Sequence, residues 1–310
     1  MTNTLCLGGK YSTMRLLTQE KIEIVNNSEE KFETLLFLPE GENKKGEGGL
    51  RTQGYFKKSF EDNPLISIIT VVFNGEKYLE ETILSVLNQT YDNVEYIIID
   101  GGSTDGTLDI IKKYEDKIDY WVSERDEGIY DAMNKGIDVS FGEIIGIINS
   151  DDYLYESTLE NINNIFQRNV NLDYVYAKLD IMSAGGSIVK NTKPLGTQHW
   201  KFKLFKHMPF FHPSLFVKKH VYQRVGLFDI SYKVSADYDF SLRLIEFGLN
   251  GHFLDITTGV FRLGGQSGGI KTYKENYKIA IDHHANKYII VLNLVILMLK
   301  MYLRKIKKVE

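Results

Sequence analysis

The sequence predicts an α/β fold built on a largely parallel central sheet. Three apolar runs rich in β-branched residues are typical of strands that are covered on both faces: Leu65–Phe73, Val94–Ile99 and Glu143–Ile148. Apolar residues at helical spacing predict helices at Lys77–Asn88, Thr104–Tyr114 and Ile129–Val139. Because strands and helices alternate along the chain, we expect an α/β domain with a mainly parallel sheet.

Later segments are less regular. Asp173–Met182 is expected to be a further strand, and Tyr238–Phe247 has the spacing of a helix. Between them, Lys193–His220 is rich in aromatic residues, histidine and proline, and is expected to be an irregular region that covers a site.

The first 63 residues differ in composition from the rest of the chain and are interpreted as a partly structured extension. Gly41–Gly49 is glycine-rich and charged, which predicts a loop or linker. Lys21–Val25 and Phe32–Leu38 are candidates for short strands.

The composition is that of an ordinary globular protein, with 310 residues of which 43% are hydrophobic and 25% charged. The single cysteine, Cys6, excludes an internal disulfide framework and indicates a reducing compartment. No secretory signal is visible in residues 1–10, so a cytoplasmic location is expected. The net charge is −4; six Lys or Arg against two acids in residues 281–310 give +4, which leaves −8 for the rest. An acidic body of this kind argues against a nucleic-acid partner.

Polar clusters lie directly after the three predicted strands, at the edge where parallel sheets bind ligands. They are Asn74-Gly75-Glu76, Asp100–Asp105 and Asn149–Asp152. In the second cluster, glycines allow a ligand to approach closely and the next helix offers free backbone amides. Asp100 is a candidate to bind a nucleobase or ribose, although a tight turn capped by Ser103 or Thr104 explains the same residues.

The third cluster, Asn149-Ser150-Asp151-Asp152, ends an apolar strand. Adjacent carboxylates pack poorly there but are good ligands for a hard divalent cation, which can hold a diphosphate. The alternative is that Asp151 or Asp152 caps the next helix.

Two more clusters precede helices. In Ser123–Gly136, Asp126, Glu127 and Asp131 are candidate ligand contacts and Lys135 is a candidate phosphate contact, or the segment is an exposed helix start. Asp237 and Asp239 are candidate general bases or an N-cap pair. The histidines lack the spacing of a zinc site. His212, beside Pro213, is a weak candidate for the acceptor site.

In their order along the chain, these clusters resemble family 2 glycosyltransferases, inverting enzymes with the glycosyltransferase A-type fold. The resemblance spans about 64–269, and the matching motifs are Ser67–Asn74, Leu84–Gln89, Ile97–Thr107, Gly128–Gly136, Ile147–Asp152 and Ala236–Leu242. The GIYDAMNKG motif with a late GGQS is similar to bacterial enzymes that build exopolysaccharide, capsule or O-antigen.

The resemblance implies that Asp237 is the catalytic base, that Asp100 holds a uracil ring, and that Asp151 is the last acid of a metal-binding D-x-D signature. With Asp152 as the second metal ligand, Mg²⁺ or Mn²⁺ is the expected cofactor. The residues expected to contact the nucleotide sugar are Val72, Asn74, Glu76, Asp100, Asp131, Lys135, Asn149 and Ser150.

This chain departs from the family pattern at two positions. Gly101 stands where the family often has a second acid, and Asn149 replaces the first acid of D-x-D, although an amide oxygen can still coordinate. The Q-x-x-R-W motif of polymerising members is not matched by Gln198-His199-Trp200, so we expect the transfer of a single sugar.

The expected organisation is an extension (1–63), a catalytic domain (64–270) and a helical C-terminal segment (271–310). The catalytic domain comprises a nucleotide-binding half (64–182) and an acceptor-binding half (183–270). The expected reaction is inverting transfer of a hexosyl or N-acetylhexosaminyl group from a nucleotide sugar to a glycan or lipid-linked oligosaccharide acceptor. The alternatives are a nucleotidyltransferase that makes an activated sugar and a non-catalytic sugar-binding module.

The apolar segment Tyr288–Leu303 is followed by four basic residues, Arg304, Lys305, Lys307 and Lys308. It is shorter than the ~20 residues that a membrane span needs. We therefore expect a helix that lies on the inner face of the plasma membrane, held by apolar burial and anionic lipid. The alternative is a helix packed on the protein or in a dimer.

Overall fold

A mixed sheet forms the centre of the protein, and its middle strands are parallel. The computed structural model describes residues 4–24, 26, 31–41, 43–194, 208–264 and 270–283. Within these residues the sheet has ten strands: β1 (Lys44–Gly48), β2 (Ile66–Val72), β3 (Val94–Asp100), β4 (Tyr120–Glu124), β5 (Ile144–Asn149), β6 (Tyr153–Leu154), β7 (Tyr174–Met182), β8 (Ile188–Asn191), β9 (Leu215–Lys218) and β10 (Gly251–Arg262). The α-helices are α1 (Leu79–Leu87), α2 (Thr107–Lys113), α3 (Ile129–Asp138), α4 (Thr158–Arg168), α6 (Lys219–Val225), α7 (Ala236–Glu246) and α8 (Ile270–Asp282).

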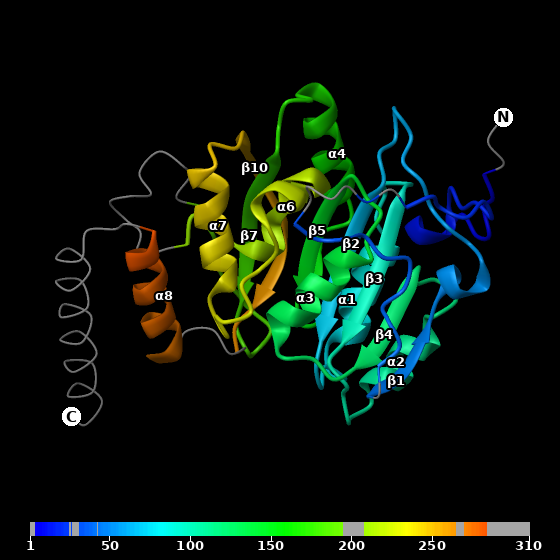
Figure 1. Cartoon of the computed structure of the whole chain (residues 1–310), viewed down its shortest axis with the longest axis horizontal. Coiled ribbons are helices and arrows are strands. Elements are labelled where there is room, and N and C mark those ends of the chain that lie inside the picture. The colour runs from blue at the N-terminus through cyan, green and yellow to red at the C-terminus, as the bar shows by residue number, and fades with distance from the viewer. Residues whose placement is uncertain are drawn as a thin grey trace.

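The strand order is β1-β4-β3-β2-β5-β9-β7-β10-β6, with β8 paired to β7 (Figure 1). Strands β4, β3, β2 and β5 run parallel, as do β7 and β10, whereas β1, β9, β6 and β8 are antiparallel to their neighbours. The register sets Val72 beside Asp100 and Val71 beside Asn149. The carboxyl ends of β2, β3 and β5 therefore meet at one edge, where the polar clusters were predicted to gather.

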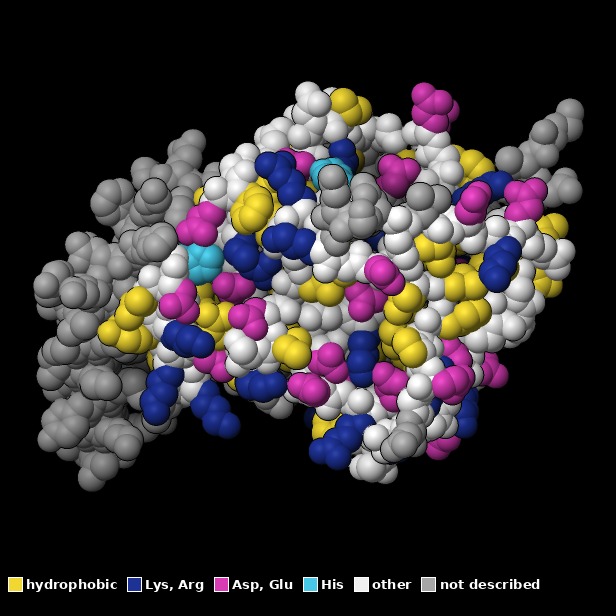
Figure 2. Space-filling view, viewed as in Figure 1, with side chains coloured by type: hydrophobic (Ala, Val, Ile, Leu, Met, Phe, Trp, Pro, Cys, Tyr) yellow, Lys and Arg dark blue, Asp and Glu magenta, His cyan; other side chains and the backbone are white. Residues whose placement is uncertain are grey.

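Helices cover both faces of the sheet. Successive strand residues point to opposite sides, so neighbouring residues pack against different helices. Ile68 packs in a buried cluster with side chains of α1, α2 and α4. Ile69 packs in a second cluster with side chains of α3, α6 and α7. On the face seen in Figure 2, acidic and basic side chains are interspersed around apolar ones.

The predicted α/β fold with a mostly parallel central sheet is confirmed. The three predicted strands are β2, β3 and β5, and the three predicted helices are α1, α2 and α3. Asp173–Met182 and Tyr238–Phe247 correspond to β7 and α7 within two residues at each end. In Lys193–His220, the residues after the undescribed part are less irregular than expected, because apolar residues following Pro213 form β9 between β5 and β7.

The loop predicted at Gly41–Gly49 is wrong, because Lys44–Gly48 forms strand β1 along β4. The glycines serve packing here: a Cβ on Gly48 would lie 2.6 Å from Nε1 of the buried Trp121, and one on Gly46 would lie 3.0 Å from the same ring. The short strands expected earlier do not form in the described residues of Lys21–Val25 and Phe32–Leu38.

A buried ion pair fixes the N-terminal region to the sheet. Nη2 of Arg51 lies 2.7 Å from Oε1 of Glu95 on β3, and both side chains are only 2% exposed. Arg51 also donates from Nη1 to the backbone oxygens of Leu36 and Val139. Residues before the first parallel strand therefore share a core with the α/β domain.

At the other end of the chain, helix α8 spans Ile270–Asp282. The apolar segment Tyr288–Leu303 lies outside the described residues. Of the helices that are described, none is long and apolar enough to cross a membrane.

Candidate active site

Two loops at the sheet edge are bonded to each other where a donor nucleotide was predicted to bind. Asn74, which lies after β2 with a φ of 52°, accepts a hydrogen bond from the Thr104 amide at 2.9 Å. Its own amide donates to Oγ of Ser103. Glu76 accepts from the Gly106 amide at 2.7 Å. The backbone oxygen of Val72 accepts from Gly101 at 2.8 Å, so the three predicted residues after and within β2 all touch the loop after β3.

Asp100 lies inside this second loop and is fully buried. Its carboxylate accepts hydrogen bonds from the backbone amide and hydroxyl of Ser103 and from the Ser123 hydroxyl. These bonds order the turn between β3 and α2. A direct contact from Asp100 to a nucleobase stays a prediction.

Gly101, one of the two departures from the family pattern, has a steric reason in this structure. A Cβ built on Gly101 would lie 2.4 Å from Oδ2 of Asp126. The carboxylate of Asp126 therefore occupies the space beside Asp100 that a side chain at 101 would take. Burial raises the pKa of Asp126, and the negative charges of Asp131 and Asp100 add to this. In the sequence, Asp126 is one of the candidate ligand contacts in Ser123–Gly136.

Asp131 and Lys135 lie one turn apart on α3. Nζ of Lys135 lies 2.6 Å from Oε1 of Glu124 and 3.4 Å from Oδ2 of Asp131. Burial works against the charged lysine, but these carboxylates outweigh it and raise the pKa of Lys135. The lysine thus stays cationic near the β4–α3 turn, and its phosphate contact stays a prediction.

The turn after β5 carries two acids, Asp151 and Asp152, which differ in their exposure to solvent. Asp152 is 1% exposed, and its carboxylate accepts from the Arg262 amide at 2.9 Å and from Nδ2 of Asn149 at 3.1 Å. Asp151 is partly exposed, and burial raises the pKa of its carboxyl group, opposed by the nearby Arg262 and His212. The backbone oxygen of Ser150 accepts from Thr82 on α1, which fixes the turn. Neither acid caps α4, because the N-cap of that helix is Ser157.

The predicted base, Asp237, lies in the first turn of α7 with its side chain 13% exposed. Its Oδ1 accepts a hydrogen bond from the Tyr130 hydroxyl at 2.9 Å, and its Oδ2 lies 3.3 Å from Nδ1 of His212. Nε2 of His212 lies 3.3 Å from Oδ1 of Asn149. A continuous row of contacts therefore joins the turn after β5 to Asp237, the predicted base, on α7. The N-cap of α7 is Ser235, so Asp237 and Asp239 are not that cap.

His212 and Tyr130 are the residues whose roles sequence reasoning missed or underrated. His212 stands in the short 3-10 turn His212–Ser214, directly before β9. Tyr130 is the second residue of α3 and is buried. The only signals in the sequence were the His212-Pro213 pair and the position of Tyr130 in the GIYDAMNKG motif.

The turn after β5 offers only a few of the ligands that a divalent cation needs. Across the described residues, no group of three or more His, Cys, Asp or Glu side chains could hold a metal. Asp151 offers a carboxylate whose charge is disfavoured by burial, a penalty that a cation would relieve. One or two carboxylates suffice for Mg²⁺ when substrate phosphates and water complete the coordination shell. Such an incomplete protein site suits a metal that arrives with a diphosphate.

Known proteins similar to this chain are glycosyltransferases. An uncharacterised glycosyltransferase of Rickettsia typhi is 33% identical over 193 residues, which cover 59% of this chain and 59% of the relative. A PGL/p-HBAD biosynthesis glycosyltransferase of Mycobacterium bovis is 30% identical over 184 residues, which cover 58% of this chain and 69% of the relative. The chain thus spans about three fifths of the length of the rickettsial relative.

Solved structures share the fold at low sequence identity. S. aureus TarS 1–349 in complex with UDP-GlcNAc matches with a TM-score of 0.55 and 19% identity, over 70% of this chain and 66% of that one. The mannosyltransferase PcManGT from Pyrobaculum calidifontis, in complex with GDP-Man and Mn²⁺, matches with a TM-score of 0.52 and 20% identity, over 73% and 70%. The model of glycosyl transferase family 2 matches residues 67–226, slightly more than half of the sequence. The chain belongs to glycosyl transferase family 2.

Proposed function

We propose that this protein is an inverting glycosyltransferase that moves a single hexosyl or N-acetylhexosaminyl group from a UDP-linked donor to a hydroxyl group. The acceptor is a glycan or a lipid-linked oligosaccharide used in cell-surface polysaccharide synthesis. One observation carries the proposal: His212 joins Asn149, in the acid turn, to Asp237, the candidate base, at 3.3 Å on each side. Membership of glycosyl transferase family 2 supports it.

The donor would bind over the loops after β2 and β3. Asn74 and Glu76 hold these loops together, Asp100 orders the turn, and Lys135 is the nearby cation for a phosphate. TarS, which shares the fold, has been solved with UDP and with UDP-GlcNAc. This supports a UDP-linked donor for the present chain.

Mg²⁺ or Mn²⁺ would be held by Asp151, with the Asn149 amide oxygen and Asp152 next to it. When bound, the cation supplies positive charge that stabilises the diphosphate as it leaves. Asp152 already has a hydrogen bond on each carboxylate oxygen, so its main part here is to shape the turn that presents Asp151. The structural relative PcManGT was solved with Mn²⁺, which supports the assignment.

Asp237 would accept the proton of the acceptor hydroxyl as that oxygen attacks the anomeric carbon from the side opposite the diphosphate. Tyr130 and His212 each contact one oxygen of this carboxylate, so its orientation is fixed before substrate arrives. A general base in such a position accelerates a reaction by about 10²–10⁴-fold.

We further propose that the protein works in the cytoplasm on the inner face of the plasma membrane. The sequence Tyr288–Leu303 with the basic residues after it is the candidate membrane contact. A lipid-linked acceptor would be presented at this surface.

The proposed function is tested with purified protein, Mn²⁺ or Mg²⁺, and a panel of nucleotide sugars, with release of the nucleoside diphosphate as the readout. Asp237→Asn should lower kcat about 10²–10⁴-fold while nucleotide binding persists. Asp116→Asn, the same substitution at an exposed aspartate, is the control. Release of pyrophosphate, or a product with the donor's anomeric configuration, would contradict the proposal.

A further inference from the structure

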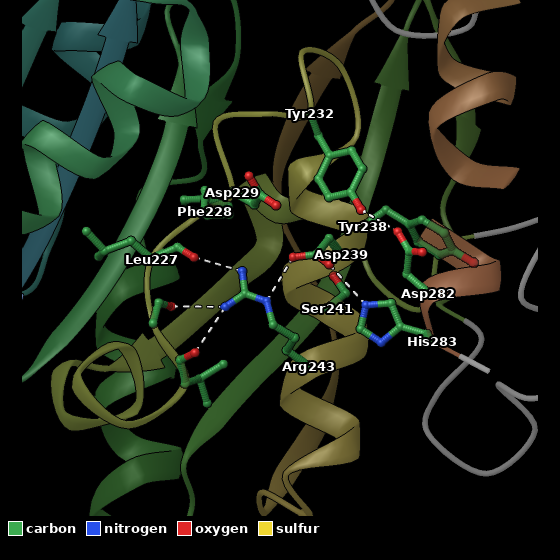
Figure 3. Close-up of polar contacts among 12 residues, drawn as sticks. Leu227, Phe228, Asp229, Tyr232, Tyr238, Asp239, Ser241, Arg243, Asp282 and His283 are labelled. Carbon is green, nitrogen blue, oxygen red and sulfur yellow. Dashed lines mark hydrogen bonds and ion pairs between the residues drawn. The ribbon is translucent and has the colours of Figure 1, made fainter. Parts of the chain in front are cut away.

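Helix α8 packs beside α7, the helix that carries Asp237 (Figures 1 and 3). Buried Ile279 of α8 joins the apolar cluster to which Phe240 and Leu244 of α7 belong. Both helices lie beyond Gly226, where the family match ends. The contacts between the two helices lie outside that match, and they hold the chain on both sides of Asp237.

The first contact lies just before Asp237 in the chain. The carboxylate of Glu275 accepts hydrogen bonds from the backbone amides of Lys233 and Val234, both at 2.9 Å. Each oxygen takes one amide, so the loop is held in both position and direction. The adjacent Tyr232 donates its hydroxyl hydrogen to Oδ2 of Asp282 at 3.0 Å.

The second contact lies just after Asp237. Asp239 is buried, and His283 at the end of α8 places Nε2 3.0 Å from its Oδ1. Nδ1 of the same ring lies 2.7 Å from Glu246. The other oxygen of Asp239 accepts from Nε of Arg243 at 2.8 Å, as Figure 3 shows.

Asp237 therefore lies between two fixed points, and both are held from α8. Its carboxylate meets Tyr130 and His212 only if the backbone of the first turn of α7 keeps its place. Anchors three residues before and two residues after remove the freedom of that turn to rotate. A misplacement of about 1 Å at a reacting group can cost 10²-fold in rate.

We propose that α8 is the element that positions the base, and that Glu275, Asp282 and His283 are positioning residues for Asp237. The inference rests on the proposed function, and it assigns to residues 270–283 a part in catalysis without any contact to substrate. Loss of an α8 anchor should reduce the rate of the chemical step more than donor binding.

The test compares Glu275→Ala and Asp282→Ala with Lys274→Ala, which removes an exposed charge from the same helix. For Glu275→Ala we expect kcat to fall about 10- to 100-fold with donor KM within about threefold. Asp282→Ala and Tyr232→Phe break the same hydrogen bond, so the double variant should be no slower than the slower single one. Assays run well below the melting temperature of each variant, so that all are folded.

Hydrogen exchange at the amides of residues 232–239 supplies a readout that needs no activity. Exchange should accelerate in Glu275→Ala and stay unchanged in Lys274→Ala. Faster exchange with an unchanged kcat would reduce α8 to a purely structural role and overturn the inference, as would unchanged exchange. A wild type that is inactive with every donor would instead reject the proposed function, while exchange would still report whether the anchors exist.

Discussion

Nδ1 of His212 lies 3.3 Å from the carboxylate of Asp237, and this contact joins two parts of the site that are distant in sequence. The other ring nitrogen reaches Asn149 at the end of β5. An imidazole held at both nitrogens can turn in neither direction without losing a partner. His212 therefore links the turn after β5 to Asp237, the predicted base.

We expect His212→Phe, which fills the space but removes both contacts, to lower kcat about 10- to 100-fold with a smaller effect on nucleotide affinity. His212→Gln keeps one polar contact and should fall between the wild type and the Phe variant. His252→Gln, on the exposed part of β10, is the control. Steady-state kinetics and calorimetry with UDP check this, and an equal loss of rate in the control would count against it.

A side chain at position 101 would occupy the same space as the carboxylate of Asp126, beside the loop after β3. Gly101→Asp would bring a second carboxylate against Oδ2 of Asp126, because even a Cβ at 101 lies 2.4 Å away. We expect the donor KM to rise about tenfold, since steric overlap and like charge displace the loop that Asp100 orders.

The compensating pair Gly101→Asp with Asp126→Gly should recover much of this loss, because one carboxylate again occupies the space. Donor KM across the two single variants and the double variant checks the prediction. A double variant worse than Gly101→Asp alone would show that Asp126 acts through something other than volume and charge.

The sequence predicted strands whose side chains are mainly apolar. β2, β3 and β5 are buried on both faces, so their composition alone identified them. β10 was not predicted because it mixes exposed and buried residues over twelve positions and carries no continuous apolar signal. β1 was taken for a loop because its glycines are selected by contact with Trp121, which local composition cannot reveal.

For the candidate site, the motif positions predicted that the polar clusters gather at one edge of the sheet, but not how their side chains pair. Asp152 looks like Asp151 in the sequence, yet one is buried with two hydrogen bonds and the other is partly exposed. The contact of His212 with Asp237 depends on β9 being inserted beside β5, a tertiary arrangement with no local signature.

The ion pair between Arg51 and Glu95 should matter for stability, because both groups are almost fully buried. Removing one partner leaves the other charge buried and unpaired, which costs about 3–5 kcal/mol. We therefore expect Arg51→Met to lower the free energy of unfolding by about that amount in a denaturant titration.

The control is Arg15→Met, since Arg15 pairs with Asp92 at 23% and 56% side-chain exposure and should contribute about 0–1 kcal/mol. The double variant Arg51→Met with Glu95→Met should be less damaging than the sum of its single changes. Purely additive losses would indicate that the two side chains stabilise the N-terminal region independently.

His283 should make the attachment of α8 depend on pH. Burial opposes charging of this ring, but hydrogen bonds with Asp239 and Glu246 outweigh it and raise the pKa above the ordinary value of 6.5. For a base whose pKa is raised by folding, the added stability is complete below the unfolded value and is lost as pH rises through the folded value. His283 and Arg243 together lower the pKa of Asp239 despite its burial, so that carboxylate remains ionised at pH 6.

His283→Gln should therefore destabilise the protein more at pH 6 than at pH 9. At pH 6 the loss should be about 1.5–3 kcal/mol, the range for a hydrogen bond to a charged group. Thermal unfolding of wild type and variant at the two pH values checks this, with His220→Gln as the control because that ring is 55% exposed beside Asp173. A larger loss at pH 9 would mean that the neutral ring, and not the charged one, holds α8 to α7.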